Sequence, residues 1–186
     1  MEQADILTLP QATWEAEYLE DTSLRRLVMD YYDREHIAIR RYLCFLGVDG
    51  ETGQEIVQEA FLKLHEHLVA GRDRSNLRAW LYRVAHNLAR NAQTAFRSSK
   101  IDPLPDAMSG TELRADIVSA EEQLLAAERA ARLRAAMDRL TPAQRECLVL
   151  RTQGMKYREI AEIVDSSIST VAENVQRGLE KLKELI

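Results

Sequence analysis

Glycine and proline are scarce in this chain, which has seven glycines and four prolines among 186 residues. Both residues disfavour helix interiors, whereas the abundant Ala, Leu, Glu and Arg favour them. β-branched and aromatic residues, which favour strands, are not the dominant types. The composition therefore predicts an all-α protein with little or no strand.

Cysteine is also scarce, and neither cysteine has a CxxC-type neighbour. Cys44 and Cys147 each lie within an apolar helical pattern, which favours burial as small hydrophobes over a disulfide or a metal site. His65 and His67 are two residues apart on a predicted helix and so point to different faces, which argues against a zinc pair. We expect neither a metal nor a cofactor. Without a Gly-rich phosphate loop or a paired nucleophile and base, the sequence does not predict an enzyme.

Long uncharged apolar runs are absent as well. No stretch approaches the roughly 18 residues of a membrane span, and the first ten residues, MEQADILTLP, lack the basic start and apolar run of a signal peptide. The sequence predicts a cytoplasmic protein without membrane insertion.

A net positive charge is missing too, since the formal charge is −5. That value argues against a nucleic-acid partner, because phosphate binding usually leaves a basic footprint. The distribution of charge reverses the argument. Residues 72–100 carry seven basic side chains and one acid, Asp73, whereas residues 101–128 carry seven acids and one base, Arg114. A basic block is thus followed by an acidic connector.

Helical periodicity divides the chain into parts. Residues 1–21 are acidic and loosely patterned, and read as an N-terminal extension. Apolar residues recur at helical spacing through 22–97, which predicts a bundle of three or four helices. The segment 98–119 holds two prolines, a glycine and scattered acids without a sustained period, as a flexible linker does. The helical pattern then resumes through 120–186, which predicts a second small domain.

Local signals in the second domain predict a helix-turn-helix. Thr141, Pro142 and Gln144 form a helix start with a capping box. Gly154 is placed to end that helix in the left-handed conformation, and Ser167 is placed to cap the last helix. Such a unit can lay its last helix in the major groove of DNA. A plain three-helix bundle is the alternative on pattern alone.

The segment LTPAQRECLVLRTQGMKYREIAEIVDSSISTVAENVQRGLEKL resembles the promoter-reading C-terminal domain of the sigma-70 family. The resemblance implies that the last helix reads the minus-thirty-five promoter element. It puts near DNA Ser169, Thr170, Glu173, Asn174 and Arg177, with Arg151, Lys156 and Arg158 as candidate phosphate contacts.

The reading face departs from the family at Ala172, Glu173 and Asn174, where basic or small residues are usual, and Ser166 replaces an apolar residue. An acid there repels phosphate, although Glu173 could accept a hydrogen bond from cytosine, worth about 1–3 kcal/mol of discrimination. A merely solvated Glu173 is the alternative.

The first domain carries the feature that separates a sigma factor from other helix-turn-helix proteins. Residues 53–68, GQEIVQEAFLKLHEHL, resemble the family's polymerase-docking helix, with Glu55 where Asp is usual. Helical spacing makes Phe61 a core residue. The resemblance assigns polymerase binding to Glu55, Gln58, Glu59 and Leu62. An amphipathic helix with solvated acids would show the same pattern.

The following segment, NLRAWLYRVAHNLARNAQTAFRS, resembles the family's helix that opens the minus-ten element. Holding unpaired bases requires basic groups for the strand and amides or pockets for the bases. The candidate minus-ten residues are Arg72, Arg74, Asn76, Arg78, Arg83, Asn87 and Arg90. Trp80, at helical spacing among apolar residues, is interpreted as core in preference to a stacking platform.

Together these features predict a sigma factor of the two-domain extracytoplasmic-function group. The resemblance implies three partners: core RNA polymerase, promoter DNA and an anti-sigma factor. Two alternatives remain open at this point. A conventional helix-turn-helix regulator would bind DNA without polymerase, and an interaction module would bind polymerase or another regulator without promoter recognition.

Overall fold

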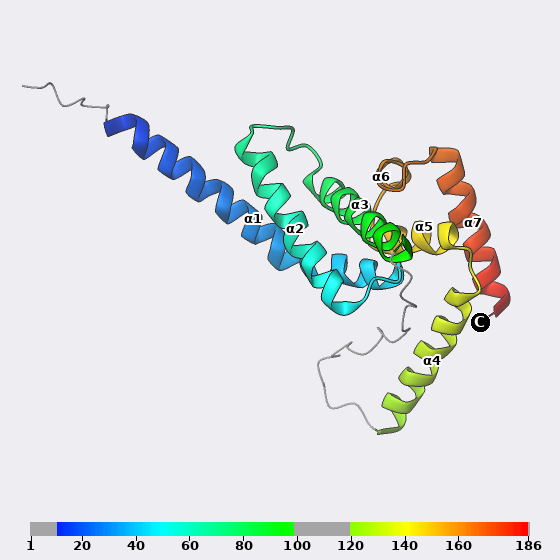
Figure 1. The fold of residues 1–186 in the computed structure, drawn as a ribbon. Coiled ribbons are helices and arrows are strands. Elements are labelled where there is room, and N and C mark those ends of the chain that lie inside the picture. The colour runs from blue at the N-terminus through cyan, green and yellow to red at the C-terminus, as the bar shows by residue number, and fades with distance from the viewer. Residues whose placement is uncertain (1–10, 99–119, 186) are drawn as a thin grey trace, which may run out of the picture.

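The computed structural model describes residues 11–98 and 120–185, and within them it contains helices and no strand. The helices are α1 (Gln11–Phe45), α2 (Gly50–Val69), α3 (Leu77–Ser98), α4 (Ala120–Asp138), α5 (Pro142–Thr152), α6 (Tyr157–Ile163) and α7 (Ile168–Leu185). Figure 1 shows α1 extending well beyond the body of the molecule, with α2 and α3 packed beside its C-terminal half. The all-α prediction is confirmed.

The ends of the helices follow the local signals in the sequence. Thr141 and Gln144 form a complete capping box at the start of α5, with the Gln144 N–H 3.3 Å from the Thr141 hydroxyl oxygen. Gly154 has φ +82°, which closes the turn after α5. The Ser167 Oγ accepts the Thr170 N–H at 3.0 Å and so caps α7. These three predictions, each based on a local rule, are confirmed.

One hydrophobic cluster includes buried residues from both ends of the chain. The helices α1 to α3 pack together, α7 packs on α5 and α6, and contacts of α6 with α3 and of α5 with α1 join the two groups. We call residues 11–98 the N-terminal half and residues 120–185 the C-terminal half. Because buried residues are continuous between them, the two halves form one packed body.

The helical region begins earlier than the sequence pattern predicts. The predicted extension 1–21 is helical from Gln11, because α1 starts there, while residues 1–10 and the predicted linker from residue 99 to 119 lie outside the described residues. The N-terminal half has three helices. Cys147 is buried, Cys44 is half-buried, and both are free. Among the described residues, no helix is long and apolar enough to cross a membrane.

Asp49 begins α2 and gives a testable link between pH and stability. Its carboxylate accepts the backbone N–H of Thr52 at 3.0 Å and of Glu51 at 3.1 Å. These hydrogen bonds, that from Thr52 above all, hold the pKa of Asp49 below its ordinary value. The cap therefore stabilises the fold above the ordinary carboxyl pKa, and this contribution is lost as the pH falls through the lowered pKa.

We expect Asp49→Ala to lower the free energy of unfolding by about 1 kcal/mol at neutral pH, since the cap is lost. Asp49→Asn keeps a side-chain oxygen that can accept these hydrogen bonds, so it should lower the free energy of unfolding by less. Urea unfolding at neutral and acidic pH would measure both changes. If Asp49→Ala lowers the free energy of unfolding by as much at acidic pH as at neutral pH, the ionised carboxylate of Asp49 is not the source of that stability.

Candidate functional site

The predicted docking surface lies on α2 and faces away from the core. Glu55, Gln58 and Leu62 are exposed, and 62% of the Leu62 side chain is open to solvent. Glu59 is half-buried and forms an ion pair with Lys63 at 2.9 Å. Spacings of three and four residues place the four predicted docking residues on one side of the helix. Leu62 is the one apolar side chain among these four residues, so the surface combines an apolar contact with hydrogen-bonding groups.

The opposite side of α2 is core. Phe61 is 6% exposed, and its ring lies edge-on to Tyr32 with the centroids 5.0 Å apart. The prediction that Phe61 is a core residue is confirmed. Core packing therefore sets the orientation of α2, and with it the direction in which the docking residues point.

Three of the seven candidate minus-ten residues share one face of α3. Arg83, Asn87 and Arg90 are all exposed, and their spacing of four and three residues brings them into line along the helix. The other face is anchored by Leu81, Ala85 and Ala89, which have no exposed surface. The arrangement presents two guanidinium groups and one amide to a ligand that lies along α3.

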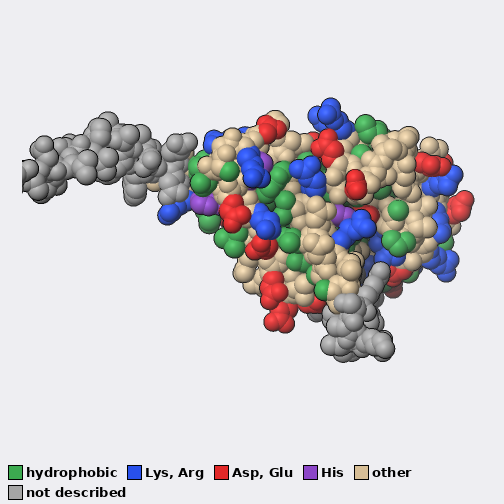
Figure 2. All heavy atoms as spheres, turned by 45° about the horizontal axis from the view of Figure 1, so that its top comes forward, with side chains coloured by type: hydrophobic (Ala, Val, Ile, Leu, Met, Phe, Trp, Pro, Cys, Tyr) green, Lys and Arg blue, Asp and Glu red, His purple; other side chains and the backbone are tan. Residues whose placement is uncertain are grey.

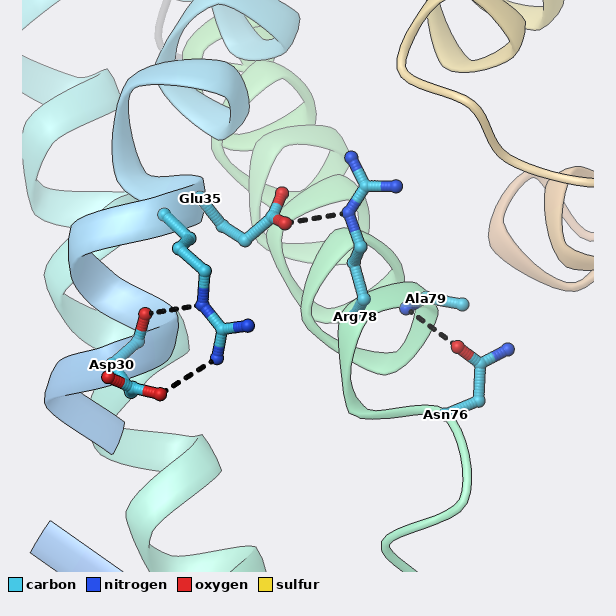
Figure 3. A network of polar contacts seen from close by, with 6 residues as sticks. Asp30, Glu35, Asn76, Arg78 and Ala79 are labelled. Carbon is cyan, nitrogen blue, oxygen red and sulfur yellow. Dashed lines mark hydrogen bonds and ion pairs between the residues drawn. The ribbon is translucent and has the colours of Figure 1, made fainter. Parts of the chain in front are cut away.

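Two further candidates are engaged within the protein (Figure 3). The Asn76 Oδ1 accepts the Ala79 N–H at 3.3 Å and caps α3, while its Nδ2 donates to Glu159 at 3.0 Å. The Arg78 Nε donates to Glu35 of α1 at 2.7 Å. Arg72 and Arg74 are exposed in the loop between α2 and α3. The structure therefore brings some of the predicted set together and directs Asn76 and Arg78 elsewhere.

A pocket of about 240 Å³ lies beside this loop and is lined by Lys63, Glu66, His67, Arg72 and Trp80. The His67 and Trp80 rings contact each other with centroids 4.5 Å apart, and His67 Nε2 lies 2.7 Å from the Asp73 carbonyl oxygen. Trp80 is half-buried: it packs against the core and also lines the pocket. Sequence reasoning missed Lys63, Glu66 and His67 as pocket residues, because only folding brings the end of α2 beside the loop.

The C-terminal half contains the predicted helix-turn-helix, formed by α6, the turn at 164–167 and α7. Val171, Val175 and Gly178 bury one side of α7. A Cβ at Gly178 would lie 2.7 Å from Leu148 Cδ1, so α7 approaches α5 closely at this point. In the turn, Asp165 has φ +51°. This packing holds the opposite side of α7 toward solvent.

The outward side of α7 carries the predicted reading residues. Ser169, Thr170, Glu173 and Arg177 are exposed, and Asn174 is half-buried. The Glu173 carboxylate forms an ion pair with Arg177 at 2.5 Å, one turn away. Glu173 is thus paired with the base beside it on the same helix, and both groups remain open to solvent.

The candidate phosphate contacts lie around α6 and are exposed. Arg151 donates to the Met155 carbonyl oxygen at 2.9 Å and lies over the Tyr157 ring. Arg158 forms an ion pair with Glu162 at 3.3 Å. The backbone N–H of Lys156 donates to the Glu159 carboxylate at 2.6 Å. These basic groups lie at the ends of short elements next to α7. Figure 2 shows basic and acidic side chains interspersed over one face of the molecule.

A buried polar cluster joins the two halves, and sequence reasoning did not predict it. Tyr42 of α1 and His86 of α3 lie 2.8 Å apart, from hydroxyl oxygen to Nδ1. The Glu146 Oε1 of α5 lies 3.0 Å from the same Nδ1 and accepts the Tyr42 hydroxyl at 3.4 Å. Burial, and next the Glu146 charge, raise the pKa of Tyr42, and the same causes raise that of Cys147 to about 11. The tyrosine therefore stays protonated and can donate.

The faces of α2, α3 and α7 are three exposed surfaces suited to macromolecules. Among the described residues, no group of three or more His, Cys, Asp or Glu side chains could hold a metal ion. Comparison with known proteins identifies two family regions in the chain. Residues 27–99 match the family model for sigma-70 region 2, and residues 130–182 match that for sigma-70 region 4. The first match contains the docking and minus-ten candidates, and the second contains the minus-thirty-five candidates.

Curated relatives match most of the chain. The chain is 29% identical over 160 residues to RNA polymerase sigma factor SigZ of Bacillus subtilis, covering 86% of each chain. It is 30% identical over 163 residues to the ECF RNA polymerase sigma-E factor of Escherichia coli, covering 84% of this chain and 82% of the relative. The ECF RNA polymerase sigma-E factor of Haemophilus influenzae is 30% identical over 141 residues, which cover 71% of this chain and 73% of the relative.

Solved structures share the fold. CnrH, in complex with the cytosolic domain of CnrY, matches with a TM-score of 0.57 and 20% identity over 90% of this chain and 94% of its own. The sigma factor RpoE of Bartonella quintana, in complex with the anti-sigma factor NepR, matches with a TM-score of 0.59 and 21% identity. The match covers 84% of this chain and 94% of the RpoE chain. From its two matched regions and these relatives, the chain belongs to the sigma-70 family and is an RNA polymerase sigma factor of the extracytoplasmic-function group.

Proposed function

We propose that this sigma factor docks on core RNA polymerase through α2, captures the unpaired minus-ten strand along α3, and reads the minus-thirty-five element with α7. The observation that carries the proposal is the row of Arg83, Asn87 and Arg90, exposed on one face of a helix whose other face is core. In the part of the chain that the structure describes, these three side chains make no hydrogen bond or ion pair within the protein. The row suits a negatively charged strand with bases to be recognised.

Docking rests on the exposed face of α2. Leu62 supplies the apolar contact, and Glu55, Gln58 and Glu59 supply acceptors and an amide around it. A small apolar anchor with a polar surround is how protein interfaces concentrate their binding energy. Because Glu59 is already paired with Lys63, a basic group on the polymerase would replace Lys63 as its partner.

Melting the minus-ten element requires a place for bases that leave the stack. The pocket beside the loop joins an aromatic wall, Trp80, to the basic groups Lys63 and Arg72. Unpaired bases stack on aromatic rings while basic side chains hold the backbone, each stacked base contributing about 1–3 kcal/mol. The pocket and the α3 row together support strand capture by the protein without any bond in DNA being broken.

On α7, Arg177 is the residue best suited to read a base, because its guanidinium group is exposed and its side chain is held by Glu173. An arginine can bind guanine through two hydrogen bonds in the major groove. We propose that Glu173 orients Arg177 or accepts from cytosine, and that Arg151, Lys156 and Arg158 hold phosphates. The remaining reading residues, Ser169, Thr170 and Asn174, line the same side of the helix.

The partners follow from this mechanism: core RNA polymerase, promoter DNA and, as with the RpoE–NepR complex among the structural relatives, an anti-sigma factor. The protein would act where the chromosome lies, in the cytoplasm, and would assist transcription without being an enzyme itself.

Run-off transcription on a promoter library with purified core polymerase tests the proposal. We expect a promoter-dependent product only when the chain is present. The double change Arg83→Ala and Asn87→Ala should lower the yield at least tenfold, because losing two strand contacts of about 1 to 2 kcal/mol each costs that much or more. Core binding, measured by co-migration on a sizing column, should be retained.

The matched control is Arg41→Ala, which removes an exposed arginine on α1 outside the predicted set and should leave the yield unchanged. A chain that gives no promoter-dependent product contradicts the proposal. Specific DNA binding without polymerase, seen by gel shift, would instead favour a conventional helix-turn-helix regulator.

A further inference from the structure

We propose that Gln176 of α7 is a further base-reading residue, which recognises an adenine in the minus-thirty-five element and is held in position by Glu180. Because it names a base that α7 would read, this role of Gln176 rests on the function proposed above. Gln176 lies outside the reading set that the sequence predicts. Its place on the helix, its exposed amide and its hydrogen bond to Glu180 carry the proposal.

Gln176 lies on the side of α7 that faces away from the core. Val171, Val175 and Gly178 are buried and define the inner side. At about 100° per residue, the direction opposite to them falls between Gln176 and Arg177, about 50° from each. Gln176 is exposed, as Arg177 is. The two side chains are therefore at the same depth along the helix, and both can reach a duplex that lies against α7.

The hydrogen bond to Glu180 decides which part of the Gln176 amide is free. Gln176 Nε2 donates to Glu180 Oε1 at 3.0 Å. A carboxylate only accepts, so the nitrogen of the amide, and not its oxygen, faces Glu180. An amide group has two N–H donors and one oxygen acceptor. One N–H and the oxygen are left for a ligand, since Gln176 Oε1 has no hydrogen-bond partner among the described residues.

The free N–H and the free oxygen match adenine. In the major groove adenine presents the N7 acceptor beside the N6 amino donor, and a glutamine binds both through two hydrogen bonds. Guanine presents two acceptors, and thymine presents an acceptor and a methyl group, so neither donates to the amide oxygen. Cytosine donates from its amino group but presents no acceptor beside it. Gln176 should therefore favour adenine over the other three bases.

The two acids nearest to Gln176 along α7 leave its amide available to DNA. Glu173 lies about one turn before Gln176, and its carboxylate is paired with Arg177. Glu180 lies one turn after Gln176, toward the C-terminal end of α7. Recognition helices contact bases mainly with their N-terminal residues, so Glu180 can hold the amide without lying against the bases. Glu180 is accordingly a positioning residue, and Gln176 is the residue that contacts the base.

Run-off transcription with core polymerase and the full chain tests this role of Gln176. The templates are randomised across the minus-thirty-five element, and a barcode in the transcribed segment identifies each one. The unaltered chain should favour adenine at one position by about 5- to 150-fold, which corresponds to about 1–3 kcal/mol. Gln176→Ala should lose this preference at that position alone, because the residues that read the other positions are unchanged. Since Gln176 is exposed, the variant should stay folded, which thermal unfolding checks.

Two changes at Glu180 test its positioning role. Glu180→Ala leaves the Gln176 amide free to rotate and should lower the adenine preference by about two- to tenfold, the cost of ordering one free side chain on binding. Glu180→Gln keeps a side-chain oxygen that accepts from Gln176, so it should retain most of the preference. The matched control is Gln54→Ala, which makes the same truncation at an exposed position of α2 and should leave all base preferences unchanged.

A base analogue separates a direct contact from an effect of DNA shape. 7-Deazaadenine keeps the amino group and the base pairing of adenine but carries C–H in place of N7. At the preferred position it should lower the yield of the unaltered chain by about fivefold, because one of the two hydrogen bonds is lost. It should not change the yield of Gln176→Ala.

An adenine preference that survives in Gln176→Ala overturns the reading role of Gln176, and so does a loss of yield that is equal for all four bases. Equal losses of preference in Glu180→Ala and Glu180→Gln overturn the positioning role of Glu180. When the unaltered chain still directs promoter-dependent transcription, these results leave the proposed function intact. If the unaltered chain directs none, the proposed function fails, and the role of Gln176 fails with it.

Discussion

Replacing Leu150 with alanine is expected to destabilise the protein by about 2–5 kcal/mol, the range for large-to-small changes in a packed core. Leu150 lies in α5, has no exposed surface and belongs to the cluster that joins the two halves. The change removes apolar contacts and leaves a cavity that the surrounding helices cannot fully close. Since natural domains are stable by about 5–15 kcal/mol, this loss is a large fraction of the total.

Urea unfolding followed by circular dichroism measures this change, with Leu133→Ala as the control. Leu133 is 48% exposed on α4, so its truncation should cost less than about 0.5 kcal/mol. If Leu150→Ala and Leu133→Ala lower the free energy of unfolding equally, Leu150 is not part of a cooperative core. Because buried residues are continuous between the halves, we expect Leu150→Ala to unfold in a single transition that is shifted to lower urea concentration. We do not expect two separate unfolding steps.

Replacing Leu62 with arginine is expected to weaken binding to core polymerase by at least about 2 kcal/mol, or about thirtyfold, while leaving the fold intact. Leu62 is the apolar residue of the docking surface, and its side chain is largely exposed. An arginine there loses the apolar contact and introduces a charge that must be desolvated on binding. Its exposure means that the free protein loses little packing.

Fluorescence titration of labelled chain with core polymerase would measure the affinity, and thermal unfolding would confirm that the variant is folded. Leu133→Arg makes the same chemical change at an exposed site on α4 and should keep the affinity within about threefold. If Leu62→Arg binds core polymerase as tightly as the unaltered chain does, the docking surface lies elsewhere.

Much of the local structure was predictable because short-range rules decide it. The capping box at Thr141, the left-handed Gly154 and the cap at Ser167 each depend on residues within a few positions, and each is present in the structure. The core position of Phe61 follows from helical spacing for the same reason. Burial of one face then fixes which side chains remain outside, so the exposed row on α3 was predictable as a surface.

Other features depend on how helices far apart in the sequence meet. Asn76 and Arg78 belong to the basic block, but their side chains bond to Glu159 and Glu35, and no pattern around residue 76 points to residue 159. The pocket is similar: His67 and Trp80 lie on different helices and meet only after the loop between them folds back. Trp80 is consequently both a packing residue and a pocket wall, where the sequence favoured core packing over a stacking platform.

The amino-acid sequence by itself determined the helical class, the helix-turn-helix and the family to which this sigma factor belongs, because these depend on periodicity, capping and motifs read along one stretch of chain. Only the tertiary structure decided that the two halves are packed together and that Tyr42, His86 and Glu146 meet between them. These three residues come from three helices and are separated by 44 and 60 positions. Their contact depends on the long-range packing of α5 against α1, which local preferences do not encode.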